Sequence, residues 1–123
     1  CVELWFGDEL IAANIGYTIG YIYSGFTKFY LKQDDKRHSG AGVMLSSALG
    51  AWLHRQGFKL YAMGQDASYK SEGVLKQSYL LNGRQWYDEV RIARQVKEPP
   101  CLAPKEASPI VVKDLLAHSE RLR

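Results

Sequence analysis

The stretch from Arg37 to Val74 constrains the fold of this chain more than any other. It begins with a glycine-containing loop, continues into a segment with helical spacing of apolar residues, stops at Gly57 and resumes as a short strand. A loop that exposes backbone N–H groups at a helix N-terminus attracts anions such as pyrophosphate or nucleic-acid phosphate, because the free donors and the helix dipole point the same way. The stretch therefore predicts a phosphate-binding loop inside an α/β unit.

The apolar spacing predicts a helix over Ala41 to Gln56, with Gly57 as its C-terminal stop. Gly50 lies inside this helix, where glycine costs about 1 kcal/mol relative to alanine, so we expect close packing on a sheet to compensate. Phe58 to Met63 predicts the strand that follows. The buried stripe of the helix is expected to consist of Ala41, Leu45, Ala48, Leu49, Trp52 and Leu53.

The residues before this stretch predict antiparallel strands. Val2 to Phe6 and Glu9 to Ile15 flank the turn signal Gly7-Asp8, which indicates a hairpin. A third strand is expected over Tyr21 to Phe26, introduced by the glycine-bounded segment 16–20. The aromatic side chains concentrated there predict either strand packing or the wall of an aromatic pocket.

The residues after it predict helices and a linker. We expect one globular unit over residues 1–94, a proline-rich linker over 95–109 and a C-terminal helix over 110–123, with Ser108 as N-cap and Pro109 at the first helical position. Within the globular unit, the expected elements are a short helix over Asp66 to Glu72, a strand over Lys76 to Leu81 and a helix over Arg84 to Val96.

Composition limits the class of protein. With 123 residues, of which 46% are hydrophobic, the chain is long enough for one core, and a net charge of +3 is too small to announce a nucleic-acid binder. No apolar run reaches the ~20 residues of a membrane span, so we expect a cytoplasmic protein without membrane contact. Cys1 and Cys101 are expected to be reduced thiols, and the three histidines lack the spacing of metal ligands. The strand-like start predicts that further N-terminal elements precede Cys1.

The order of strands, glycine loop, helix, strand and tyrosine motif resembles the GNAT acyltransferase superfamily. The marks are RHSGAG at residues 37–42, similar to an R-x-x-G-x-G loop, and YKSEGV at residues 69–74. The resemblance covers residues 2 to about 93 and implies a mostly antiparallel sheet flanked by helices. It implies that Gly40, Ala41 and Gly42 hold phosphate through their backbone amides and that Tyr69 acts as an acid.

Within that fold, the chain resembles the C-terminal domain of leucyl/phenylalanyl-tRNA protein transferases. The similar segments are VELWFGDELIAANIGYTIGYIYSGFTKF, SGAGVMLSSALGAWLHRQGFKLYAMG and YKSEGV. These enzymes move an amino acid from aminoacyl-tRNA to the N-terminal α-amine of a protein, which marks that protein for degradation. The resemblance implies aminoacyl-tRNA and an acceptor protein N-terminus as partners and no further cofactor.

Acyl transfer to an amine needs a proton acceptor, a stabiliser of the oxyanion and a pocket for the acyl group. We expect an apolar aminoacyl group to be held by Tyr21, Tyr23, Ser24, Phe26 and Met44. Phosphates or the terminal adenosine of tRNA are expected at Arg37, Ser39, the glycine loop and Lys70.

The chain departs from the bacterial members of that family at two positions. Phe26 stands where they carry a glutamate, and Ala62-Met63-Gly64 stands where they carry Asp-x-Gln. Gln65 and Asp66 are the nearest polar substitutes and are expected, with Tyr69, to be catalytic; the alternative is that Gln65 and Asp66 only shape a turn. Two other functions remain open: an acetyl-CoA-dependent N-acetyltransferase, and a binding module that keeps the fold without catalysis.

Overall fold

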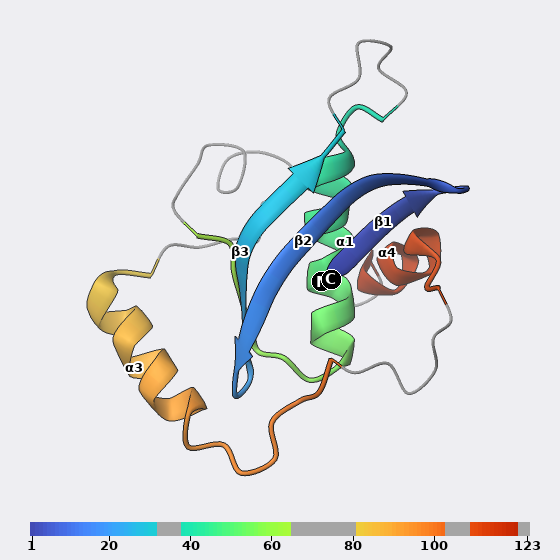
Figure 1. The fold of residues 1–123 in the computed structure, drawn as a ribbon. Coiled ribbons are helices and arrows are strands. Elements are labelled where there is room, and N and C mark those ends of the chain that lie inside the picture. The colour runs from blue at the N-terminus through green and yellow to red at the C-terminus, as the bar shows by residue number, and fades with distance from the viewer. Residues whose placement is uncertain (32–37, 65–80, 103–108, 121–123) are drawn as a thin grey trace.

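The computed structural model describes residues 1–31, 38–64, 81–102 and 109–120 of the chain (Figure 1). Within these residues, three strands lead into a long helix, a short fourth strand follows, and two further helices come after it. The bounds are β1 Val2–Phe6, β2 Glu9–Ile19, β3 Ile22–Tyr30, α1 Ala41–Arg55, β4 Leu60–Ala62, α3 Gly83–Ala93 and α4 Val112–Glu120. The elements expected within residues 65–80 lie outside the described residues.

The strands form one four-stranded sheet in the order β1-β2-β3-β4. β1 pairs with β2 and β2 with β3 in antiparallel directions, whereas β4 pairs with β3 in parallel. The parallel pair is joined through α1, which lies across one face of the sheet (Figure 1). The expected mixed α/β class with a mostly antiparallel sheet is therefore confirmed.

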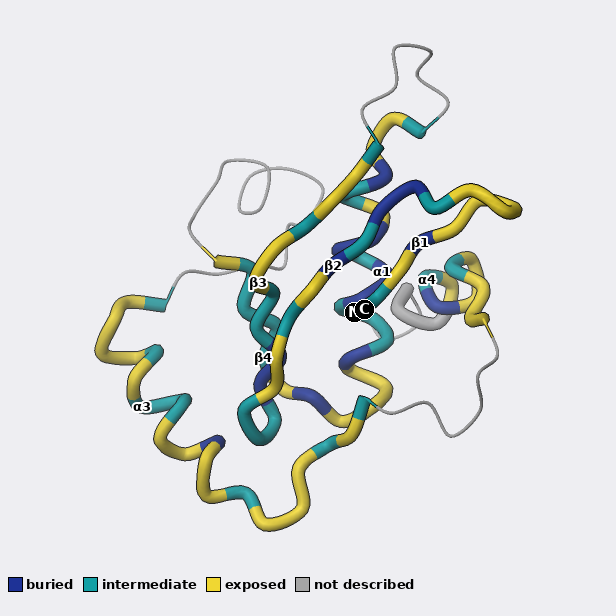
Figure 2. Tube along the Cα trace, in the orientation of Figure 1, coloured by how far each residue is buried: buried dark blue, intermediate teal, exposed yellow. Residues whose placement is uncertain are grey.

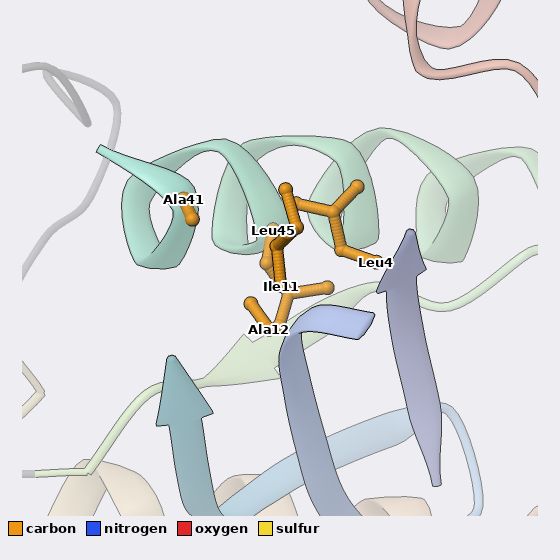
Figure 3. Close-up of a cluster of buried hydrophobic side chains, with 5 residues drawn as sticks. All are labelled: Leu4, Ile11, Ala12, Ala41 and Leu45. Atoms are coloured by element: carbon orange, nitrogen blue, oxygen red, sulfur yellow. The ribbon is translucent and has the colours of Figure 1, made fainter. Parts of the chain in front are cut away.

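The core lies between that face of the sheet and α1. One cluster joins Leu4, Ile11 and Ala12 of the strands to Ala41 and Leu45 of the helix (Figure 3). Ile11 and Ala12 are consecutive, yet both are buried, because Leu4 pairs with Ala12 and Trp5 with Leu10, so that Ile11 is an extra, bulged residue. A second cluster continues toward the other end of α1 and consists of Tyr23, Leu49, Leu53 and Phe58.

The predicted helix stop at Gly57 is confirmed as a Schellman motif. Gly57 has φ +90°, its N–H donates to the His54 carbonyl at 3.1 Å, and the Phe58 N–H donates to the Leu53 carbonyl at 3.0 Å. Phe58 and Leu53 also share the second core cluster. The motif draws Phe58 into the core, and β4 is consequently shorter than the expected strand over Phe58 to Met63.

The strands on either side of the second turn are longer than expected. β2 continues through the segment 16–20 as far as Ile19, and the turn is Gly20-Tyr21, in which Gly20 has φ +53°. β3 continues beyond the predicted Phe26 to Tyr30. Gly16 does not break the strand, because it pairs with Gly25 across the sheet.

The two C-terminal helices differ from expectation mainly at their ends. α3 ends at Ala93 rather than Val96, and α4 begins at Val112, so Pro109 is not its first residue; Ser108 lies outside the described residues. Burial explains where α4 lies: Leu115 is 5% exposed, Val112 packs on the first core cluster, and the Arg55 guanidinium donates to the Asp114 carbonyl at 3.0 Å. The helix therefore begins at Val112, a residue that packs on the core, and not at Pro109.

Burial follows the layers (Figure 2). Buried positions line the α1 side of the strands and the sheet side of α1, whereas α3 is exposed or half-buried over most of its length. Among the described helices, none is both long and apolar enough to span a bilayer.

Candidate functional site

The first turn of α1 is left open to an anion. Its N-cap is Gly40, in the left-handed conformation with φ +82°, and within the described residues no side chain caps the turn and no acidic residue lies in it. The Ala41 N–H donates to the His38 carbonyl at 3.1 Å, and the Met44 N–H donates to the Gly40 carbonyl at 2.9 Å. The amides between them lie at the positive end of the helix dipole, which favours a bound anion.

A side-chain contact ties this loop to the first hairpin. The His38 imidazole lies 3.1 Å from a Glu9 carboxylate oxygen, and its side chain is only 5% exposed. The Phe6 ring meets the imidazole edge-on, with 5.3 Å between ring centroids. The entrance to α1 is therefore fixed relative to the β1–β2 turn, whereas Ser39 and Gly40 remain exposed. Arg37, the other residue predicted in this loop, lies outside the described residues.

A chain of polar groups runs between the sheet and α1. The Tyr23 hydroxyl donates to the Asn14 side-chain oxygen at 2.6 Å, and Asn14 is 3% exposed. Lys28, opposite Asn14 in register, donates to the Ser46 hydroxyl at 3.3 Å, and that hydroxyl donates to the Gly42 carbonyl at 3.0 Å. The hydrogen bonds of Lys28 and Ser46 therefore join β3 to the first turn of α1, beside the buried pair of Tyr23 and Asn14.

Sequence reasoning missed Asn14, Lys28 and Ser46. The available signal was alternation: in β2 the buried Ala12 and Asn14 are two residues apart and face the same side, so a polar side chain was due on the core face. A buried amide needs a partner, and the nearest hydroxyls on adjacent elements were the candidates.

Two paired glycines make room for the hydrogen bond between Tyr23 and Asn14, with Gly16 beside the Tyr23 phenol and Gly25 beside the Asn14 amide. A Cβ at Gly16 would lie 2.5 Å from the Tyr23 hydroxyl oxygen, and one at Gly25 would lie 3.3 Å from the Asn14 amide nitrogen. Tyr61 of β4 packs edge-on against the Tyr23 ring, with centroids 5.6 Å apart. Burial raises the pKa of Tyr23 above its usual value. Tyr23 is thus a core residue beneath the site rather than a wall of an open pocket.

A bulge in β3 places Phe26 at the surface. Ile15 pairs with Thr27 and Gly16 with Gly25, so Phe26 has no partner across the strand pair, and it is 80% exposed. Bulges of this kind re-aim a side chain and are frequent beside active sites. Met44, in the first turns of α1, is 46% exposed, and Ser24 is half-buried where β3 meets the last residue of β4.

Tyr21 lies at the opposite end of β3 from Tyr30, next to α3. Its hydroxyl donates to Glu89 of α3 at 2.9 Å, and the Lys59 ammonium lies 5.1 Å from the centre of its ring. Desolvation raises the pKa of Tyr21, and so do its hydrogen bond to the Glu89 carboxylate and the negative charge of that carboxylate. Since the first turn of α1 packs on Tyr30 near Gly42, the structure does not gather Tyr21 with Met44.

Several predicted site residues cannot be placed. Gln65, Asp66, Tyr69 and Lys70 lie outside the described residues, so the catalytic relay stays a prediction. The described chain approaches them through Gly64, which has φ +80°. No group of His, Cys, Asp and Glu suited to a metal ion occurs among the described residues, and both cysteines are exposed thiols outside any disulfide.

Comparison with known proteins adds no family: no family model matches the chain, and neither do any curated protein or solved structure.

Proposed function

We propose that the chain is an aminoacyltransferase with a GNAT-like fold, which moves an amino acid from aminoacyl-tRNA to the N-terminal amine of a protein. One observation carries the proposal: the uncapped, glycine-led first turn of α1 lies against the part of β3 that extends beyond β4. Pairing with β4 stops at Ser24, β3 continues to Tyr30, and a Cβ at Gly42 would lie 3.4 Å from the Tyr30 ring. Within the described residues, the proposed phosphate position therefore adjoins a part of the β3 edge on which no strand pairs.

This arrangement supplies positioning for acyl transfer. The amine nitrogen bonds to the ester carbonyl carbon, the bond to the ribose oxygen breaks, and that oxygen leaves with a proton. The amides of Gly40 and Gly42 would hold a donor phosphate, while the exposed Phe26 and Met44 offer apolar contact to the aminoacyl group. Because the ester is already activated, holding it beside the amine supplies much of the acceleration. Tyr69, Gln65 and Asp66 remain the proposed proton carriers.

A transfer assay tests this function. The protein is given a panel of charged tRNAs together with acceptor peptides, and acetyl-CoA is offered in a parallel reaction. We expect the amino acid to appear on the peptide N-terminus. Acetyl transfer without response to aminoacyl-tRNA would establish the acetyl-CoA reading instead, and binding of either donor without turnover would establish a non-catalytic module.

A variant at Ser39 tests the phosphate position. Ser39→Glu adds a carboxylate at the exposed entrance to α1, where it stabilises the helix but repels a phosphate. We expect KM for the donor to rise about fivefold, which corresponds to about 1 kcal/mol, while Tm stays level or rises. Ser39→Gln is the neutral control of equal size. If Ser39→Glu and Ser39→Gln have the same KM, the donor phosphate does not lie at this turn.

A further inference from the structure

The inner face of α3 is fixed to the turn between β2 and β3. Ala93 is fully buried, and its carbonyl lies so close to Gly20 that a Cβ there would clash. Glu89, one helical turn earlier, accepts the hydrogen bond from Tyr21. Since positions three and four apart share a helix face, this contact line determines which side of α3 turns to solvent.

The outer face of α3 carries a hollow of about 250 Å³. The residues that line it are Tyr87, Val90, Arg91, Arg94 and Gln95. Tyr87 is 64% exposed and the Arg91 side chain 60%, so both are available to a ligand. The hollow lies on the opposite side of the helix from Glu89 and Ala93, away from the α1 site.

The charge of this face is unbalanced. Asp88 faces two arginines, with Arg84 at 3.6 Å and Arg91 at 3.9 Å. Within the described part of the chain, no carboxylate pairs with Arg94. One carboxylate for three guanidinium groups leaves an excess of positive charge beside an exposed aromatic ring.

These groups fit a ligand that combines a phosphate with a flat ring. A guanidinium binds phosphate oxygens in a forked geometry, and a tyrosine ring stacks on a nucleobase. Val90 offers an apolar floor, and the Gln95 amide can hydrogen-bond a base edge. We propose that the hollow between Tyr87, Arg91 and Arg94 binds one unpaired nucleotide of the RNA donor, away from the acyl-transfer site. The choice of RNA as the ligand rests on the proposed function. The preference for a phosphate and a flat ring follows from the residues of α3 alone.

Direct RNA binding tests the inference without catalysis. Uncharged tRNA and a short single-stranded RNA are titrated with the whole chain at several salt concentrations, and fluorescence anisotropy gives Kd. For Arg91→Gln with Arg94→Gln, we expect Kd to rise about tenfold, and the slope of log affinity against log salt to become shallower by about 0.7, because the contact with the one phosphate of the bound nucleotide is lost. Arg84→Gln, on the same helix but outside the hollow, is the matched control.

The aromatic ring is tested separately. Tyr87→Ala should weaken binding at least fivefold with an unchanged salt slope, whereas Tyr87→Phe keeps the stacking surface and most of the affinity. Circular dichroism and thermal unfolding check that α3 persists in each variant.

Three results would overturn the inference: no RNA binding by the unaltered chain, equal loss for Arg84→Gln and the double variant, or competition by an acidic phosphopeptide as strong as that by RNA. Failure of the two proposals is distinguishable. Loss of RNA binding in the hollow variants, with no transfer by the unaltered chain, removes only the transferase function. Transfer by the unaltered chain, with RNA affinity indifferent to the hollow, removes only the inference.

Discussion

At the scale of single residues, Tyr23 shows how side-chain volume and polarity are matched in this core. Tyr23 is 2% exposed and its phenol reaches Asn14; the absent side chain of Gly16 leaves room for the phenol, and that of Gly25 leaves room for the Asn14 amide. An unpaired buried amide or hydroxyl costs about 1–3 kcal/mol, so the hydrogen bond matters more for what its loss would cost than for its own strength.

The burial of Tyr23 makes the free energy of unfolding depend on pH in the alkaline range. Its pKa is raised in the folded chain, so the neutral phenol is favoured there, whereas in the unfolded chain the phenol ionises near the usual tyrosine pKa of 10.0. The stability from this preference is complete below about pH 10 and is lost as pH rises toward the folded pKa. We expect denaturant titrations to give a falling free energy of unfolding above pH 10. Tyr23→Phe should reduce that slope, not abolish it, because the pKa of Tyr21 is also raised. An equal slope in the variant and the unaltered chain would contradict the assignment.

Gly50 illustrates a residue whose expected role is wrong. Close packing on the sheet was expected to compensate for glycine in α1, but a Cβ there would meet only the Tyr61 ring, at an ordinary 3.8 Å. We therefore expect Gly50→Ala to raise the free energy of unfolding by about 0.5–1 kcal/mol, measured by urea denaturation. Gly20→Ala is the contrasting variant, because φ +53° and the Ala93 carbonyl both oppose a side chain. A loss of stability for Gly50→Ala would contradict the prediction.

At the scale of elements, the sequence predicted those helices and turns that are determined by residues close together along the chain. The helix α1 has both an apolar stripe and a glycine stop, and the structure places it over Ala41–Arg55. The hairpin around Gly7-Asp8 was equally readable. The lengths of β2 and β3 could not be predicted in this way. They depend on the pairing of Gly16 with Gly25 across the two strands, whereas a glycine in either sequence segment alone indicates a strand end.

In α3, too, the start of the helix depends on residues close in sequence, whereas the packing of its end depends on a distant residue. Asn82 and Gln85 form a capping box, in which each side chain accepts from the backbone N–H of the other at 2.9 Å. Its sequence spacing is local, whereas the burial of Ala93 against Gly20 depends on the distant turn.

At the scale of the whole molecule, part of the candidate site could be predicted. Sequence located the uncapped loop at Gly40, because glycine before an amphipathic helix is a local pattern. It grouped Tyr21, Tyr23 and Phe26 by proximity along the chain, although Tyr21 contacts α3, Tyr23 is buried and Phe26 is bulged to the surface. The bulge could not be foreseen, since it is defined by the register of two strands together.

The parallel β3–β4 pair has a consequence for the order of folding. Two-residue turns connect β1 to β2 and β2 to β3, whereas Leu60 reaches Ile22 only after the whole of α1. Closing a long loop costs entropy before its contacts form, so we expect the meander of β1 to β3 to gain protection first and β4 to join it last. Pulse-labelled hydrogen exchange would follow the Lys59 amide, which bonds the Tyr21 carbonyl at 3.0 Å. Its protection together with, or before, the β2–β3 amides would contradict this order. Its delay would make β4, the strand that Gln65 and Asp66 follow in the sequence, the last described strand to join the sheet.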